Sequence, residues 1–459
     1  MATSTTSLGI PGFGGDLLTP GDGGYDEARA VFNGMIDRTP TLIAVCRTTD
    51  DVVAAVNFAR EQGLPISVYG GGHGVTGAAV VDGGLVVDMR GMKGIQVDPA
   101  ARTARAEGGL NWGEFDAATQ EHGLAVTGGR VPDTGIAGLA LGSGSGWLER
   151  KLGFTCDNLI GAEVVTADGR VVKASADENP ELFWGLRGGG GNFGIVTAFY
   201  LQLHPIGPIV LGGLLAWPAP MAGEVVRFWR DFMTSAPDEV GGALAFITAP
   251  PADFVPEPVR GHPVVGCIVC YAGDPEEGEK VIQPLREFGP PGLDLLGAMP
   301  YVAVQDLITE ANPHGRRNYW SADFLAGLPD EAIDAFVQHA TNPVSPFSQM
   351  LIIAGGGAIA RVPEDATAFG ERTAPFNTHY LSMWEGEEND AENIEYTRAI
   401  AAAMKPWTTG RAYLNFIGDE GLHRIESSFG EKKYARLQAL KAEWDPDNVF
   451  CHNQNIKPA

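Results

Sequence analysis

The stretch VYGGGHGVTG at residues 68–77 decides how the rest of the chain is interpreted. It sets one histidine, His73, among five glycines at the end of an apolar run. Because glycine carries no side chain, a bulky ligand can approach such a backbone closely. Successive N–H groups of a loop of this kind can converge on an anion such as a pyrophosphate. The residues that supply these groups are Gly70, Gly71, Gly72 and Gly74.

Other glycine-rich motifs fit this loop poorly. A G-x-G-x-x-G dinucleotide fingerprint needs its glycines to open a helix, whereas GGGHGVTGAAVVDGGLVV leads into another strand. A Walker loop needs Gly-Lys-Ser/Thr, which this stretch lacks. For His73 itself, spacing alone favours a hydrogen-bonded loop residue over a residue that touches a ligand. A metal role is weaker still, because no second histidine or carboxylate lies at ligand spacing.

Composition bounds the classes of function. The 459 residues, 44% of them hydrophobic, predict a globular protein of two or three domains. The 32 basic and 57 acidic residues give a net charge of −25, which repels nucleic acid and anionic membranes. The first residues lack the basic and apolar regions of a secretion signal, and no stretch approaches the ~18 apolar residues of a membrane span. We therefore expect a cytoplasmic protein with neither a nucleic-acid nor a membrane partner.

The cysteines predict neither a disulfide framework nor a metal site. Five scattered cysteines are too few and odd in number for such a framework. Cys267 and Cys270 form a C-x-x-C within VVGCIVCY, which is typical of a strand. Side chains three residues apart on a strand point to opposite faces, and no second pair completes a zinc site.

Changes of hydrophobic period predict an α+β organisation with mixed sheets. A helix is expected at residues 48–63, with Asp50 or Asp51 as its cap and Gly63 at its end. The following LPISVYG is a strand that runs into the glycine loop. Further expected elements are a strand at 84–89, a strand and helix at 103–123, a hairpin at 159–175 that turns at Ala167-Asp168-Gly169, and helix, glycine loop and strand at 179–205.

Residues 127–153 contain eight glycines among 27 residues and almost no regular pattern. They still include the apolar Ile136, Leu139, Leu141 and Trp147. A long irregular stretch that keeps apolar residues in a compact domain is seldom a linker. We expect it to lie along a flat ligand.

A shift of composition at HPIGP, residues 204–208, predicts a second domain inserted into the first. From there to about residue 409 glycine becomes rarer, and helical segments such as 221–233 and 330–340 alternate with strand-like ones. The tail, with RAYLNFIGDE and DPDNVFCHNQNIKP, is expected to close back on the first domain. The predicted units are a ligand-binding domain at 1–207 with its core at 36–207, a substrate domain at 208–409 and a returning segment at 410–459.

Four motifs in this order resemble the FAD-linked oxidases of the vanillyl-alcohol-oxidase superfamily, and within it the berberine-bridge-enzyme-like branch. They are ISVYGGGHGVTG, VPDTGIAGLALGSGSGWLERKLGFTCDNLIGAEVVTADG, ELFWGLRGGGGNFGIVT, and YLNFIGDE with DPDNVFCHNQNIKP. The resemblance implies a PCMH-type FAD-binding domain of two α+β subdomains. It also implies an inserted α+β substrate domain, an antiparallel sheet covered by helices, that roofs the flavin ring.

The resemblance also assigns cofactor-binding residues. His73 matches the histidine that the family bonds covalently to the 8α carbon of FAD, an 8α-histidyl linkage. A neutral imidazole nitrogen can add to the electrophilic quinone-methide form of the ring. The other matching positions are Gly70, Gly71, Gly72, Gly74, Val75, Gly77, Val131, Thr134, Gly135, Gly138, Gly142, Gly144, Gly146, Asn192, Gly194, Ile195, Val196, Asn453 and Asn455.

Two departures from the family pattern change the expectations. Bicovalent members carry a cysteine where this chain has Val131, and Cys156 lies at a place not used for linkage, so a single covalent bond is expected. Many members read Tyr-x-Asn-Tyr where this chain has Tyr413-Leu-Asn415-Phe416. The last tyrosine is the general base in several relatives, and phenylalanine cannot accept a proton.

The resemblance implies an FAD-dependent oxidoreductase that is expected to act as an oxidase. Hydride would leave a C–H next to an alcohol or amine for the flavin, and O2 would then accept the electrons and give hydrogen peroxide. A dehydrogenase, an oxidative cyclase of secondary metabolism and a noncatalytic flavin-binding protein stay open. The class of substrate also stays open between a sugar, an alcohol, an amine and a phenolic natural product. The candidate bases are Tyr413, Tyr319, Asp323, Tyr380 and Glu385.

Overall fold

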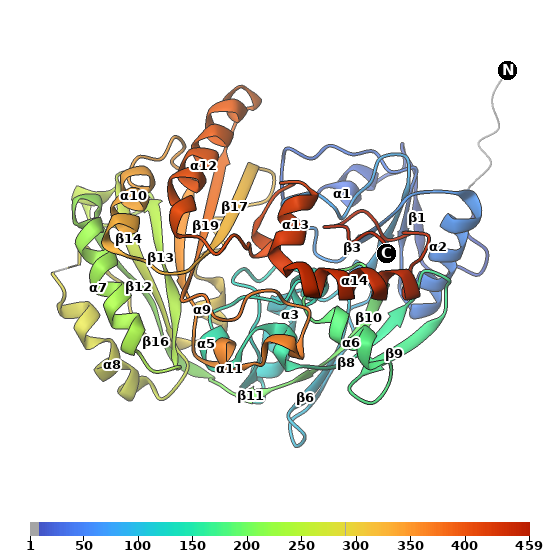
Figure 1. Cartoon of the computed structure of the whole chain (residues 1–459), viewed down its shortest axis with the longest axis horizontal. Coiled ribbons are helices and arrows are strands. Elements are labelled where there is room, and N and C mark those ends of the chain that lie inside the picture. The colour runs from blue at the N-terminus through green and yellow to red at the C-terminus, as the bar shows by residue number, and fades with distance from the viewer. Residues whose placement is uncertain (1–8, 290) are drawn as a thin grey trace.

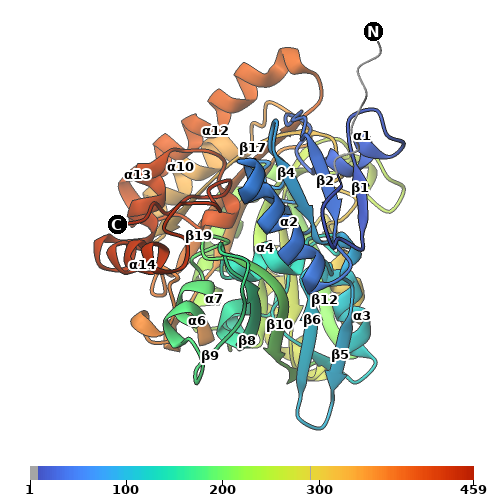
Figure 2. The same cartoon turned by 90° about the vertical axis from the view of Figure 1, so that its right-hand side faces the viewer.

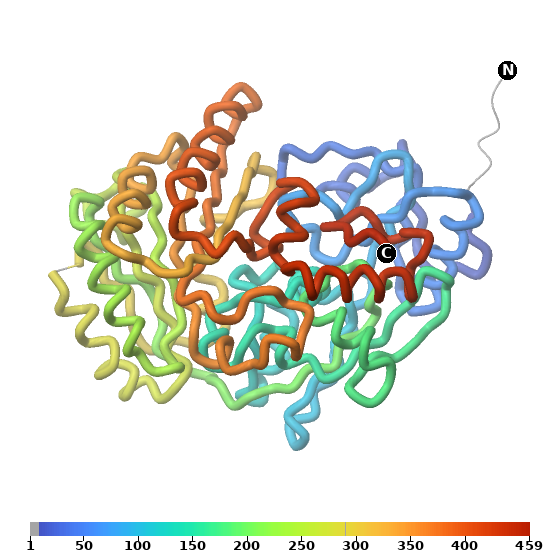
Figure 3. Tube along the Cα trace, viewed as in Figure 1, coloured from blue at the N-terminus to red at the C-terminus, as the bar shows by residue number. Residues whose placement is uncertain are grey.

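The structure is a computed structural model that describes residues 9–289 and 291–459. Two α+β halves lie side by side, and the end of the chain crosses back over the first half (Figures 1 and 3). Helices and sheets occur in both halves, which confirms the expected fold class. No helix in the described ranges has the length and apolar character of a membrane span.

The first sheet carries the glycine loop at the end of one strand. Its order is β1-β2-β4-β3, and β2, β4 and β3 run parallel. Helix α2 covers this sheet (Figure 2). Val52 and Val56 of this helix are buried against it. The bounds are β1 Asp16–Leu18, α1 Tyr25–Arg29, β2 Leu42–Val45, α2 Thr49–Gln62, β3 Ile66–Tyr69 and β4 Leu85–Asp88.

The cap of α2 differs from the expected one. Thr48, not Asp50 or Asp51, is the N-cap, and its hydroxyl accepts the Asp51 N–H. The Asp51 carboxylate accepts the Thr48 N–H in return, so the predicted cap serves as the second partner of a capping box. Gly63 ends the helix with φ of 65°, as predicted.

The second sheet is antiparallel and has the order β5-β6-β10-β8-β9. The predicted hairpin at 159–175 and the helix, loop and strand at 179–205 are both present. The strand bounds are β5 Ile95–Asp98, β6 Thr103–Glu107, β7 Leu124–Ala125, β8 Leu159–Val165, β9 Val171–Ser175, β10 Ile195–Gln202 and β11 His204–Pro205, where β7 pairs with β11. The helices are α3 Trp112–Gln120 and α6 Pro180–Leu186.

Residues 127–153 are more regular than their glycine content indicates. They form two short helices, α4 (Ile136–Leu141) and α5 (Glu149–Leu152). Helix α4 begins after Gly135 and ends at Gly142, so the apolar run between these two glycines makes little more than one turn. Such a short helix leaves almost no periodic signal in the sequence.

The second half is built on an eight-stranded antiparallel sheet of order β15-β12-β14-β13-β18-β19-β17, with β16 beside β12. Helices α7, α8, α10 and α12 cover one face (Figure 1). Cys267 faces that core and Cys270 faces the opposite one, as the strand interpretation requires. The strands are β12 Ile209–Pro218, β13 Val240–Thr248, β14 Pro263–Tyr271, β15 Leu293–Asp294, β16 Gly297–Pro300, β17 Arg317–Leu325, β18 Gln349–Ala354 and β19 Phe376–Trp384. The helices are α7 Ala222–Ser235, α8 Pro275–Glu287, α9 Tyr301–Asp306, α10 Asp330–Ala340, α11 Ala358–Arg361 and α12 Asp390–Met404.

The C-terminal segment returns to the first half through α13 (Leu422–Phe429) and α14 (Glu431–Trp444). Lys441 on α14 is fully buried and lies 2.6 Å from Asp445. Its ammonium also donates to the backbone carbonyl oxygens of Asn192 (2.7 Å) and Phe450 (3.0 Å). One lysine therefore ties the last segment to the glycine loop before β10. The domain boundaries near 207 and 409 stay a prediction.

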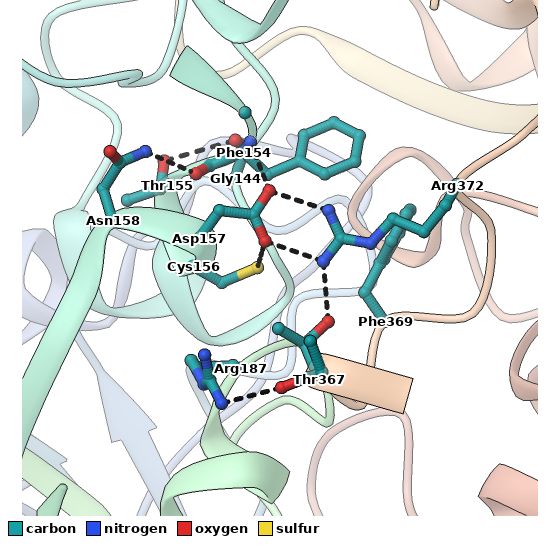
Figure 4. A network of polar contacts seen from close by, with 12 residues as sticks. Gly144, Phe154, Thr155, Cys156, Asp157, Asn158, Arg187, Thr367, Phe369 and Arg372 are labelled. Carbon is teal, nitrogen blue, oxygen red and sulfur yellow. Dashed lines mark hydrogen bonds and ion pairs between the residues drawn. The ribbon is translucent and has the colours of Figure 1, made fainter. Parts of the chain in front are cut away.

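A buried ion pair joins the two halves beside this segment (Figure 4). Both guanidinium ends of Arg372 bond the Asp157 carboxylate at 2.7 Å, and Arg372 also donates to Thr367. Cys156 lies in the same network, with its sulfur 3.7 Å from Asp157. Burial raises the pKa of the Cys156 thiol, which is the behaviour of a small buried residue.

Candidate active site

A cavity of about 380 Å³ opens between the two halves. One wall consists of glycine-rich loops of the first half, and the other is the face of the large sheet opposite its helices. The C-terminal segment closes a third side through His452, Asn453 and Gln454. Three parts of the chain that are distant in sequence therefore meet around one space.

Two features of the structure explain why the loop at 70–75 is rich in glycine. A Cβ on Gly71 would come within 2.2 Å of the Gly135 nitrogen, so these two loops pack backbone against backbone. Among the described residues, the N–H groups of residues 70–75 donate to no protein acceptor. A row of free N–H groups on the cavity wall fits a pyrophosphate.

His73 borders the cavity and is held from two sides. Its Nε2 lies 3.0 Å from Oδ1 of Asp133, and its ring stacks on Phe32 at 4.3 Å. The second carboxylate oxygen of Asp133 lies 2.6 Å from Nε2 of His314, which comes from the other half. Burial works to raise the pKa of Asp133, but the bonds with His314 and His73 hold it well below its usual range.

Sequence spacing did not reveal this cluster. The ligand atoms of His73, Asp133 and His314 lie within 4.8 Å of one another, a separation that also suits a cation. Only the fold brings them together, because 60 residues separate the first two and 181 the last two. The two histidine–carboxylate hydrogen bonds already occupy the facing atoms of the three side chains without an ion.

Most positions that resemble the family's FAD contacts border the cavity. They are His73, Gly70, Gly71, Gly72, Gly74, Val75, Val131, Thr134, Gly135, Gly138, Gly142, Asn192, Gly194, Ile195, Val196 and Asn453. Asn453 also donates to the Gly191 carbonyl oxygen at 3.0 Å, whereas its own side-chain oxygen is buried without a partner. A buried orphan acceptor at the cavity wall fits a ligand that donates a hydrogen bond.

Gly77, Gly144, Gly146 and Asn455 lie outside the cavity lining. The first three are needed for local backbone geometry. Gly77 has φ of 67°, and a Cβ on it would meet Ile36 at 2.6 Å. A Cβ on Gly146 would come within 1.9 Å of the Gly128 carbonyl oxygen. These glycines therefore shape the loops rather than line the space.

Tyr413 borders the cavity, but hydrogen-bond donors surround its hydroxyl oxygen. The oxygen accepts the N–H groups of Gly144 (3.0 Å) and Ser145 (2.7 Å), and the side-chain nitrogen of Asn415 lies 3.4 Å away. Burial raises the pKa of this phenol to about 12, although the hydrogen bonds act to lower it. The Tyr413 hydroxyl therefore holds the turn at 142–146 in place.

The other predicted bases lie outside the cavity lining. Successive side chains of a strand point to opposite faces. Because Trp320 and His379 border the cavity, their neighbours Tyr319 and Tyr380 point away from it, as does Asp323. The prediction of Tyr319, Tyr380 and Asp323 as bases considered only the residue type, and these residues lie on the face of the sheet away from the cavity.

Each of these residues has a partner away from the cavity. Asp323 pairs with Arg424 at 2.6 Å, and burial raises the pKa of this carboxyl to about 6 against the effect of the arginine. Tyr380 accepts the hydroxyl hydrogen of Thr378 at 2.8 Å. Tyr319 lies beneath the guanidinium of Arg398. The exposed Glu385 pairs with Arg316 at 3.3 Å.

His379 is the cavity residue that sequence reasoning missed. Its ring stacks parallel to Phe416 at 4.1 Å and meets Trp320 edge to face at 5.0 Å. Its Nε2 has no hydrogen-bond partner among the described residues. Burial, and secondarily the charge of Arg130, lowers the pKa of His379 to about 3, so the ring is neutral at neutral pH.

The comparisons with known proteins agree with this arrangement. Residues 40–175 match the family model described as FAD binding domain, and residues 412–457 match the model described as berberine and berberine like. The matched ranges hold the glycine loop with His73 and the segment with Asn453 that meet at the cavity.

Relatives match nearly the whole chain. The (R)-6-hydroxynicotine oxidase of Paenarthrobacter nicotinovorans is 34% identical, with 97% of each chain covered. An FAD-linked oxidoreductase of Dictyostelium discoideum is 33% identical over 92% of this chain and 89% of its own. The crystal structure of 6-hydroxy-D-nicotine oxidase from Arthrobacter nicotinovorans superimposes with a TM-score of 0.89 at 30% identity, covering 99% of this chain and all of that one.

Proposed function

The chain belongs to the berberine-bridge-enzyme-like FAD-linked oxidases and is an FAD-dependent oxidoreductase, and we propose that its FAD is bonded covalently to His73 alone. The reaction that we propose takes hydride from a C–H next to an alcohol or amine and passes the electrons to O2. FAD supplies the hydride acceptor when it is bound. The residues of this chain bind it, orient the substrate and accept a proton.

The observation that carries the proposal is the environment of His73. Asp133 engages Nε2, and among the described residues Nδ1 has no hydrogen-bond partner. A histidine that donates Nε2–H to a carboxylate keeps a lone pair on Nδ1, which is the form that can attack an electrophilic carbon. Because the same side chain borders the cavity, Nδ1 is the nitrogen that we assign to the flavin bond.

A single bond is proposed because the second position cannot form one. Val131 borders the cavity where bicovalent relatives carry cysteine, and valine has no nucleophile. Cys156 is fully buried outside the cavity lining. The pyrophosphate is assigned to the free N–H groups of residues 70–75, and Asn453 supplies an acceptor from the C-terminal side.

Acid precipitation tests the link directly. The purified protein is expected to give a yellow pellet, and a peptide that contains His73 is expected to carry the mass of FAD. His73→Ala is expected to release any bound flavin into the supernatant. A colourless pellet from a yellow native protein would exclude the covalent bond but leave flavin binding intact.

Electron transfer needs a separate measurement. Anaerobic mixing with an oxidisable substrate is expected to bleach the flavin absorbance, and admitting air is expected to restore it with release of hydrogen peroxide. A flavin that is bleached but not restored by O2 would indicate a dehydrogenase. A flavin that no substrate bleaches, although dithionite reduces it, would indicate a flavin-binding protein without this activity.

A further inference from the structure

One polar side chain on the substrate wall of the cavity is left without a partner. The wall comprises residues of β13, β14, β17, β18 and β19. Gln349 donates to Asn312 at 3.1 Å, and Trp320 donates to Asn318 at 3.0 Å. His379 is 4% exposed, and the described residues provide no hydrogen bond to its Nε2. Among the polar residues of these strands that line the cavity, His379 is thus the one whose side chain makes no hydrogen bond within the described residues, whereas Gln349 has only its side-chain oxygen free.

The position of His379 follows from the register of the sheet. His379 pairs with Leu351 on β18 and with Ala322 on β17. The stacked Phe416 ring fixes its plane from the side of the C-terminal segment. A buried ring held between strand neighbours and an aromatic face is preorganised, so little freedom is lost when it binds a substrate.

The rest of the wall limits the class of substrate. The residues around His379 that face the space are apolar, namely Ala243, Ile268, Leu351, Ile353 and Leu381. No Asp, Glu or Lys lines the cavity within the described residues. Arg130, which does line it, lies 3.3 Å from Glu149. An ammonium group would find no carboxylate here, and the polar side chains near His379 that line the space, Asn312, Gln349 and Asn415, are few for the many hydroxyls of an oligosaccharide, whose burial without partners costs free energy.

We propose that His379 is the catalytic proton acceptor of this site and that the substrate is a compact, uncharged alcohol with an apolar or aromatic body. The proposal rests on the proposed flavin chemistry. The alcohol donates its O–H to the imidazole of His379. With FAD bound, the flavin would accept hydride from the carbinol carbon while the O–H proton passes to His379, so the carbonyl product would form with both electrons transferred. Because burial lowers the pKa of His379 to about 3, the imidazole would hold this proton only transiently and would release it for the reduction of O2. O2 then takes up the two electrons and two protons as hydrogen peroxide.

Two substitutions separate proton transfer from binding. His379→Asn keeps an acceptor of hydrogen bonds but cannot take a proton at neutral pH, whereas His379→Phe removes both properties. With 4-methoxybenzyl alcohol as substrate, His379→Asn is expected to slow anaerobic flavin reduction by about a hundredfold or more. The covalent flavin content is expected to stay unchanged. Tyr380→Phe, on the opposite face of the same strand, is the matched control and is expected to react as the unaltered protein does.

Binding without turnover provides a second readout. 2-Phenylpropan-2-ol has the hydroxyl but no hydrogen on its carbinol carbon, so it cannot lose hydride. Titration of the flavin absorbance with this alcohol is expected to give similar Kd values for the unaltered protein and His379→Asn, and a Kd about tenfold higher for His379→Phe, equivalent to a loss of about 1.4 kcal/mol. If the flavin of His379→Asn is reduced at the rate of the unaltered protein, His379 is not the proton acceptor. If all three proteins bind 2-phenylpropan-2-ol with equal Kd values, the hydroxyl does not contact His379.

The substrate class is tested by three matched probes. We expect kcat/KM for 4-methoxybenzyl alcohol to exceed that for 4-methoxybenzylamine and for cellobiose. A preference for the amine or the disaccharide would overturn this class but leave the flavin proposal standing. Flavin that dithionite reduces but none of the three probes bleaches would overturn the substrate class as well. Protein without any flavin would instead overturn the proposed function.

Discussion

The Nε2 atom of His73 lies 3.0 Å from Oδ1 of Asp133, and this contact selects which imidazole nitrogen is available in the cavity. A carboxylate partner favours the tautomer with hydrogen on Nε2 and stabilises the imidazolium that forms when Nδ1 attacks carbon. Asp133→Asn keeps the shape but lacks the charge. We expect this variant to bind FAD yet to retain several-fold less flavin in the acid-precipitated pellet.

The matched control is His314→Asn, which removes the outer partner of Asp133 and leaves the inner contact intact. His314 is half-exposed, so its loss is expected to lower the covalent fraction less than Asp133→Asn does. A time course of pellet absorbance after FAD is added to the apoprotein measures both effects. Equal covalent yields for all three proteins would contradict the role of Asp133.

Tyr413 is one of the bases expected from the sequence, and Tyr413→Phe tests whether its role is structural instead. Its hydroxyl accepts two buried N–H groups, from Gly144 and Ser145, which would be left unpaired. We expect a loss of about 1–3 kcal/mol in the free energy of unfolding, measured by chemical denaturation. Flavin reduction is expected to fall far less than in His379→Asn. A tenfold or greater loss of the reduction rate with unchanged stability would instead identify Tyr413 as the base.

The sequence predicts the glycine loops on one side of the cavity well and the residues of the facing sheet poorly. The glycine loop and the hairpin after it are short-range signals, because turns and strand periods depend on neighbouring residues. The same is true of Gly63, which ends α2 as expected. Asp133 and His314 could not be assigned to His73, since only the folded chain brings these distant residues together.

His379 shows why the residues of the facing sheet are harder to predict. Every residue of β19 is buried, because helices cover one face of the sheet and the cavity wall packs on the other. A strand buried on both faces has no apolar–polar alternation, so its sequence does not tell which residues face the ligand. Tyr380 and His379 are equally plausible from composition, and only the pairing with β18 separates them.

The pair of Asp157 and Arg372 predicts a stability effect away from the cavity. The pair is drawn in Figure 4. Both side chains are almost fully buried, with exposed fractions of 6% for Asp157 and 1% for Arg372. Removing one partner leaves the other charge unpaired, so Arg372→Met is expected to destabilise the protein by about 3–5 kcal/mol. The double variant Asp157→Leu with Arg372→Met is expected to regain much of this loss. Thermal unfolding of the two single variants and of the double variant tests this expectation. If the losses of stability in the single variants simply add in the double variant, the two residues are not coupled.

Asp116 predicts how stability changes with pH. This carboxyl on α3 is buried, and its Oδ2 accepts a hydrogen bond from Gln305 of α9 at 2.9 Å, between the two halves. Burial raises the pKa of Asp116 to about 7, and the Gln305 bond only partly opposes it. The folded protein therefore holds a proton that the unfolded chain has already lost. This contribution is complete below the ordinary pKa of 3.8 and is lost as pH rises towards 7.

Asp116→Asn keeps the size of the side chain and does not titrate. The free energy of unfolding of the variant relative to the unaltered protein is expected to rise between pH 4 and pH 7, with a steepest slope of about 1.4 kcal/mol per pH unit. Melting temperatures of both proteins at closely spaced pH values measure the difference, and Asp330→Asn, at an exposed carboxyl, serves as the control. Parallel curves for Asp116→Asn and the unaltered protein would show that Asp116 is ionised in the folded state. A gap that opens near pH 4 and keeps widening above pH 7 would place the pKa of Asp116 higher than burial between α3 and α9 implies.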